Sequence, residues 1–171
     1  EPLPPHPRHL ELRRAYLEPA GDERFWEGEM LLRQIFDSYG GDPQSEYTMR
    51  HADLDRLRRR RRENYAALLA GIPAEPRGFR PVFPVLPEGT VPCNFTVYAD
   101  VRDHFQAYLA ERGIRSTTFW PVGPLVSLAG CPEEQYIYDH VVSIPCGQWL
   151  DGEDMAYTAS ALAAYEPPSG G

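Results

Sequence analysis

The sequence predicts an α+β protein in which helices come first and are followed by a small antiparallel or mixed sheet with helices on one face. Two observations support this fold class. Apolar residues recur at helical spacing in the first part of the chain, and short runs with a two-residue period alternate with helical stretches from residue 79 onward. The 18 prolines separate these elements. The expected order after the first helices is β-β-α-β-β-α.

Three helices are expected in the first part of the chain. A short helix at residues 10–17 is followed by one that begins at Asp22 as its N-cap and ends at the Gly40-Gly41 pair. A third helix, at 53–70, is ended by the glycine and proline that follow it. The apolar faces comprise Phe25, Met30, Leu32, Ile35, Phe36 and Tyr39 in the second helix, and Leu54, Leu57, Tyr65, Leu68 and Leu69 in the third.

Four strands are expected after these helices. Residues 79–86 are typical of an edge strand interrupted by proline, and residues 93–98 alternate apolar and polar side chains as a half-buried strand does. The third and fourth strands are expected at 114–120 and 140–144.

Two further helices are expected between and after these strands. Asp100 is expected to cap the first of them, which ends at Gly113. Its inward stripe comprises Val101, Phe105, Tyr108 and Leu109. Asp151 is expected to cap the last helix, whose inward side chains are Met155, Ala159 and Leu162.

Composition limits the classes of function. The chain has 25 acidic and 17 basic residues and a net charge of −8, which disfavours general binding to nucleic acid or to an anionic membrane. It has no apolar run of membrane-spanning length, and its start does not resemble a signal peptide. The three cysteines lie far apart and fit a reducing cytoplasm, so we expect a cytoplasmic protein.

All 17 basic residues are arginine, so the chain contains no lysine. Chemistry that needs a lysine amine, such as Schiff-base formation, therefore cannot be carried by side chains of this chain.

Other motifs are weaker. The run Arg58 to Arg62 resembles a nucleic-acid patch, but on a helix its side chains point in all directions among acidic neighbours, which favours a solvated face. The histidines and cysteines lack metal-ligand spacing, so no metal site is expected. No signature of a nucleophile with a histidine base and no glycine-rich phosphate loop is present. The residues by themselves show no complete catalytic constellation.

Five local motifs, in order, resemble the C-terminal part of the DegT/DnrJ/StrS aminotransferases, which are pyridoxal-phosphate enzymes of fold type I. They are R-R-E-N-Y-A-A-L-L at 61–69, the helix-to-strand step at 109–114, T-F-W-P at 118–121, H-V-V-S-I-P-C at 140–146 and G-E-D-M at 152–155. The likeness runs from about residue 22 to residue 165. It implies a tail or linker with a short helix at 1–21, the family's small domain at 22–166 and a disordered tail at 167–171.

The resemblance also implies roles for individual residues. Arg115, Thr117 and Trp120 are expected to line the substrate pocket, with Arg115 gripping a carboxylate and Trp120 forming an apolar wall. The other interpretations are an exposed strand position for Arg115 and a core position for Trp120. Asn64 and Tyr65 are expected to dock their helix rather than to touch substrate. Many family members carry a histidine beside the aromatic-proline segment; Phe119 and Trp120 stand there instead.

The implied function is that of a small-domain subunit or fragment of a pyridoxal-phosphate-dependent aminotransferase. It would form one wall of the cleft that binds a small-molecule substrate. The cofactor would be held mainly by a lysine-bearing large domain, in a hetero-oligomer that acts in the biosynthesis of sugars or of specialised metabolites. Two other interpretations stay open: a non-catalytic partner or scaffold subunit, and a ferredoxin-like binding module that uses its arginine run as an anion patch.

Overall fold

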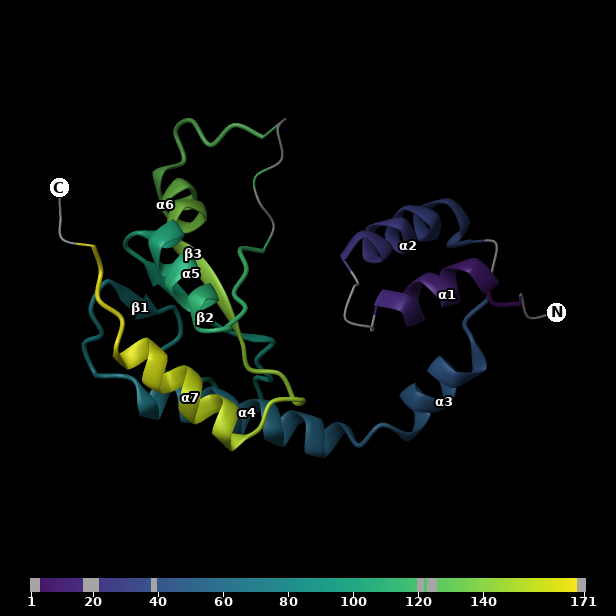
Figure 1. Ribbon diagram of the computed structural model, residues 1–171, viewed down its shortest axis with the longest axis horizontal. Helices are drawn as coiled ribbons and strands as arrows, with labels where there is room; N and C mark the ends of the chain where they lie inside the picture. The colour runs from purple at the N-terminus through teal and green to yellow at the C-terminus, as the bar shows by residue number, and fades with distance from the viewer. Residues whose placement is uncertain (1–3, 17–21, 38–39, 120–121, 123–125, 169–171) are drawn as a thin grey trace. The chain divides into compact units, whose positions relative to one another are not determined.

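A computed structural model describes residues 4–16, 22–37, 40–119, 122 and 126–168. The chain forms two compact units, Glu1–Asp53 and Leu54–Gly171 (Figure 1). The boundary between these units differs from the one expected after residue 21. A family domain over 22–166 stays a prediction. No helix among the described residues is long and apolar enough to cross a membrane.

The first unit is helical. Its helices are α1 (Pro7–Tyr16), α2 (Asp22–Ile35) and α3 (Pro43–His51). Helices α1 and α2 pack together where Leu12, only 4% exposed, lies opposite Gly28. Helix α3 was not expected from the sequence. Its N-cap Asp42 accepts hydrogen bonds from two backbone N–H groups, but the helix has no buried residue, so hydrophobic periodicity does not reveal it.

The second unit holds the sheet. Its elements are α4 (Leu54–Gly71), β1 (Phe79–Pro81), β2 (Asn94–Ala99), α5 (Arg102–Glu111), α6 (Pro132–His140), β3 (Val141–Pro145) and α7 (Gly152–Ala163). The three strands are antiparallel in the order β1-β2-β3. The α+β class and the antiparallel sheet are therefore confirmed, whereas the first strand is shorter than expected. Helix α7 lies so close to α4 that a Cβ at Gly71 would come within 2.5 Å of the Ala159 Cβ.

Helices cover both faces of the sheet, so the prediction that they lie on one face is wrong. The inner face is buried, and its β2 residues are Phe95, Val97 and Ala99. Helix α4 packs on this face through Tyr65, whose ring centroid lies 5.0 Å from that of Phe95. On the outer face the ring of Tyr98 lies 5.5 Å from that of Tyr136 in α6. Helix α6 was not expected from the sequence, and its apolar side chains stay largely exposed.

A third strand was expected at 114–120, but residues 114–119, the described part of this segment, do not form a strand. In the described part of this segment a single bridge joins Thr117 to Ser143, with N–H···O distances of 3.0 and 2.8 Å. The ladder does not continue in either direction along β3. Pro145 has no N–H to donate, and the N–H of Val141 already donates to a carbonyl of α6. This edge of β3 therefore pairs at one position.

The end signals of the later helices are confirmed in part. Asp151 caps α7 in a reciprocal capping box with Asp154, and Gly113 adopts a left-handed φ of 70° after α5. The expected cap of α5 is wrong. Its N-cap is Val101, without a side-chain hydrogen bond, because Asp100 is engaged with the sheet, where its N–H donates to the Gly78 carbonyl.

Candidate functional site

Three hydroxyl side chains lie side by side across the outer face of the sheet. Thr96 of β2 is the register partner of Ser143 in β3, and Ser143 in turn pairs with Thr117. Residues directly opposed in an antiparallel pair project to the same face. None of the three hydroxyls has a hydrogen-bond partner among the described residues. We call Thr96, Ser143 and Thr117 the hydroxyl row.

A cavity of about 430 Å³ adjoins this row. Its sheet side is formed by Asn94, Thr96 and Ser143, and its walls by the loop 83–93, Tyr65 and Phe119. The volume falls within the range of small-molecule pockets, roughly 300–1,000 Å³. Phe119 remains 48% exposed beside the cavity. We call this space the Phe119 cavity; it combines apolar walls with small polar groups at one side.

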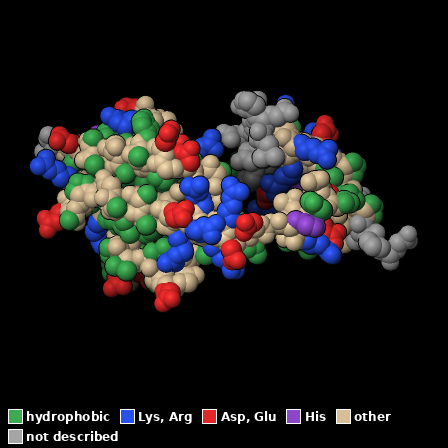
Figure 2. All heavy atoms as spheres, turned by 90° about the horizontal axis from the view of Figure 1, so that it is seen from below, with side chains coloured by type: hydrophobic (Ala, Val, Ile, Leu, Met, Phe, Trp, Pro, Cys, Tyr) green, Lys and Arg blue, Asp and Glu red, His purple; other side chains and the backbone are tan. Residues whose placement is uncertain are grey.

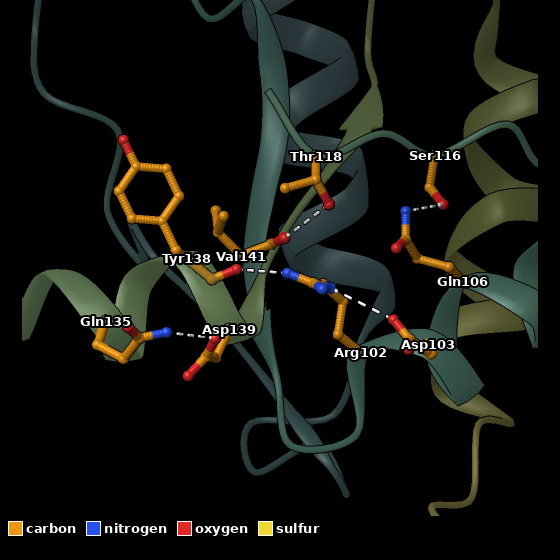
Figure 3. A network of polar contacts seen from close by, with 9 residues as sticks. All are labelled: Arg102, Asp103, Gln106, Ser116, Thr118, Gln135, Tyr138, Asp139 and Val141. Atoms are coloured by element: carbon orange, nitrogen blue, oxygen red, sulfur yellow. Dashed lines mark hydrogen bonds and ion pairs between the residues drawn. The ribbon is translucent and has the colours of Figure 1, made fainter. Parts of the chain in front are cut away.

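The segment before Phe119 keeps the alternation of a strand although it pairs at one position. Ser116 and Thr118 are turned inward: Ser116 Oγ lies 3.5 Å from the amide nitrogen of Gln106, and Thr118 donates to the Val141 carbonyl at 3.3 Å (Figure 3). Arg115, Thr117 and Phe119 are the exposed residues between them. These three alternate positions therefore form the outward side of the segment.

The structure places the three residues that were expected to bind substrate differently. Thr117 belongs to the hydroxyl row. Arg115 is exposed and lines a separate surface hollow beside α5 with Gln106, and it has no ion-pair partner among the described residues. Trp120 lies outside the described residues. Four further residues of the site were not predicted from the sequence: Asn94, Thr96, Phe119 and Ser143. The alternation of β2 predicts that Asn94 and Thr96 lie on its polar face. That they lie next to Ser143 depends on the register between β2 and β3, which the sequence pattern does not give.

Helix α4 anchors the segments around the cavity, as expected for Asn64 and Tyr65. Asn64 is buried, and its side-chain NH₂ donates to the carbonyls of Gly147 at 2.9 Å and Leu150 at 3.2 Å. The hydroxyl of Tyr65 donates to the Phe83 carbonyl at 2.7 Å, and burial raises the pKa of this phenol. Both residues therefore hold loops against the helix.

The arginine run of α4 also has structural contacts. Figure 2 shows basic side chains gathered on one face of the molecule with acidic side chains among them. Arg61 donates to the Pro92 carbonyl at 3.1 Å and Arg62 to the Pro87 carbonyl at 3.1 Å, so both fasten the loop 83–93. Arg58 lies 3.6 Å from Asp55. Some arginines of the run that resembles an anion patch are therefore already engaged in contacts within the chain.

The chain itself does not fit the role of holding pyridoxal phosphate. That cofactor is anchored through a lysine, and the sequence contains none. In the described part of the chain, no group of three or more His, Cys, Asp or Glu residues is arranged to hold a metal ion. In the described residues, the site offers hydrogen bonds and an apolar wall.

Comparisons with solved structures find aminotransferases. The aminotransferase TlmJ from Streptoalloteichus hindustanus is similar with a TM-score of 0.56 and 27% identity, over 65% of this chain and 32% of that one. DesV from S. venezuelae, solved with a ketimine intermediate, is similar with a TM-score of 0.57 and 25% identity, over 84% of this chain and 44% of that one. The sugar aminotransferase CalS13 from Micromonospora echinospora has a TM-score of 0.53 at 24% identity, over 66% of this chain and 31% of its own, which shows the fold.

No family model matches the sequence, and no curated protein matches it. The chain spans between about a third and less than half of the length of these solved structures. A structure described as a DegT DnrJ EryC1 StrS aminotransferase, from Brucella abortus, is similar in fold over 31% of its length. The chain therefore resembles a partial domain of the DegT/DnrJ/EryC1/StrS aminotransferases, which confirms the likeness drawn from its sequence motifs.

Proposed function

We propose that this chain is the small-domain part of a pyridoxal-phosphate-dependent aminotransferase and forms one wall of its substrate cleft. The single observation that carries the proposal is the hydroxyl row beside the Phe119 cavity, on a fold shared with aminotransferases. The reactive lysine and most cofactor contacts come from a large domain, on the same polypeptide or on a separate one. The two parts then act as one enzyme.

The chemistry of the wall favours a polyhydroxylated substrate. Each hydroxyl can donate one hydrogen bond and accept others, so three adjacent hydroxyls match the alternating donors and acceptors of a sugar ring. Phe119 supplies an apolar surface for the ring's carbon face. Arg115, exposed and without an ionic partner in the described residues, supplies a fork of donors for a phosphate or carboxylate. One solved relative, CalS13, is itself described as a sugar aminotransferase.

The first experiment tests the need for a large domain. The chain is mixed with a lysine-bearing large domain of this family, and amino-group transfer to a nucleotide-linked keto-sugar is measured. We expect activity when both parts are present and none from either part by itself. Full activity of the large domain without this chain would favour the non-catalytic scaffold instead.

A matched pair of variants tests the wall. Thr117→Val removes an outward hydroxyl, whereas Thr118→Val removes one that is turned to the β3 backbone. Loss of one hydrogen bond, about 0.5–1.5 kcal/mol, corresponds to a rise in KM of roughly 2- to 13-fold for Thr117→Val. Thr118→Val is expected to lower stability and to leave KM unchanged. Equal KM values for the two variants would remove the hydroxyl row from the substrate site.

A further inference from the structure

Two cysteines lie just beyond the last register pair of the β2–β3 ladder. Its last register pair joins Asn94 to Pro145, so continuing the register by one residue sets Cys93 against Cys146. Directly opposed residues of an antiparallel pair have Cα atoms about 4.5–5.5 Å apart. This spacing lies within the Cα separation that a disulfide spans, roughly 4.4–6.8 Å. Alternation along β3 directs the Cys146 side chain to the inner face, whereas Cys93, one residue before β2, is exposed at the edge of the Phe119 cavity.

Helix α4 fastens the backbone on both sides of this pair. Arg61 donates to the carbonyl of Pro92, next to Cys93, at 3.1 Å and to the side-chain oxygen of Gln148 at 2.7 Å. Asn64 donates to the carbonyl of Gly147 at 2.9 Å. The two cysteine-bearing segments are therefore held on the same helix, which limits their separation in the folded chain.

The two thiols differ in access. Cys93 is exposed beside the Phe119 cavity, whereas Cys146 belongs to the buried core. An oxidant from solvent therefore reacts with Cys93 first, whereas Cys146 is shielded from it inside the protein. Solvent access of one cysteine and a second cysteine nearby are two features of redox-sensor pairs.

We propose that Cys93 and Cys146 are a redox-sensitive dithiol that hydrogen peroxide converts to an intramolecular disulfide. In the first step the Cys93 sulfur attacks one peroxide oxygen, the O–O bond breaks, and Cys93 sulfenic acid and water form. In the second step the Cys146 sulfur attacks the sulfenic sulfur, the S–O bond breaks, and the thiol proton leaves with hydroxide as water. The dithiol loses two electrons and the peroxide gains them. This inference does not depend on the proposed function.

The charges around Cys146 make the second step dependent on pH. Burial raises the pKa of its thiol to about 11, while the Arg61 guanidinium opposes the rise and Cys93 adds to it. Tyr65 of α4 is the other titratable group that interacts with Cys146. The thiolate is the attacking form, so disulfide closure should become faster as the pH rises from 7 to 9.

The experiment uses the full chain, reduced and then treated with hydrogen peroxide. Thiols are counted by mass after alkylation, and linked peptides are mapped after cleavage at acidic residues. Cleavage at arginine would leave Cys131 and Cys146 on one peptide, because no arginine or lysine follows Arg115. We expect two thiols to be lost per chain, in a Cys93–Cys146 linkage, at a rate independent of protein concentration.

Three variants complete the test. Cys131→Ser should form the Cys93–Cys146 disulfide at the rate of the parent chain. Cys93→Ser, at an exposed position, should keep Cys146 reduced. Cys146→Ala, checked for native circular dichroism, should accumulate a Cys93 sulfenic acid that dimedone traps. A linkage to Cys131, a closure rate proportional to protein concentration, or oxidation of Cys93 to sulfinic acid in the parent while Cys146 stays reduced would overturn the proposal.

Discussion

Replacing Asn64 by alanine should destabilise the second unit strongly. In the folded chain the Asn64 side chain donates to the carbonyls of Gly147 and Leu150 at 2.9 and 3.2 Å, and lies 3.5 Å from that of Cys146. Two good hydrogen bonds are worth roughly 1–3 kcal/mol together. The Gly147 carbonyl keeps the Leu150 N–H as a donor at 3.1 Å, whereas leaving the partly buried Leu150 carbonyl without its Asn64 donor costs about 1–3 kcal/mol. Because these contributions overlap, we expect a loss of about 2–4 kcal/mol in the free energy of unfolding.

Urea denaturation followed by circular dichroism measures this loss. The matched control is Glu63→Ala, at the exposed neighbouring position of the same helix, which should change stability by less than about 0.5 kcal/mol. Equal stabilities for the two variants would refute the reasoning, since they would mean that the segment after β3 is not held by Asn64.

Three further predictions concern local stability and use the same denaturation assay. Asp151→Ala removes the capping box of α7 and should cost about 1 kcal/mol, with a matching loss of helical signal. Gly78→Ala should cost more than Gly89→Ala: both glycines have positive φ, 69° and 76°, but a Cβ at Gly78 would lie 2.8 Å from a Pro167 carbon, whereas Gly89 faces open space. Equal losses would contradict that close approach. Tyr65→Phe should cost about 0.5–1.5 kcal/mol, the hydrogen bond to the Phe83 carbonyl, and an unchanged midpoint would count against that bond.

Much of the fold could be predicted because its signals are local. The alternation of β2 and the cap of α7 act within a few residues, and both appear where the sequence places them. The two helices that were missed, α3 and α6, have no buried residues, so they lack the hydrophobic stripe on which prediction depends. Proline follows the N-cap in both, which is the local signal that could have identified them.

The candidate site was harder to predict because it depends on strand register. The expected strand at 114–120 is reduced to one bridge by features of its neighbour: a proline in β3 and the end of α6. No pattern inside that segment reveals them. Thr117 was named from the family likeness, and its role in substrate binding stays a prediction. Its neighbour Ser143 enters the candidate site only through the pairing of β3. The proposed cysteine pair depends on the same register.

The central claim is that this lysine-free chain contributes a substrate-binding wall and needs the amine of another domain. The most direct measurement is amino-group transfer by the purified chain supplied with pyridoxal phosphate, an amino donor and a keto-sugar, before and after addition of a lysine-bearing large domain. We expect no transfer before the addition and turnover after it, with a higher KM for Thr117→Val. Sustained transfer by the purified chain without any large domain would contradict it.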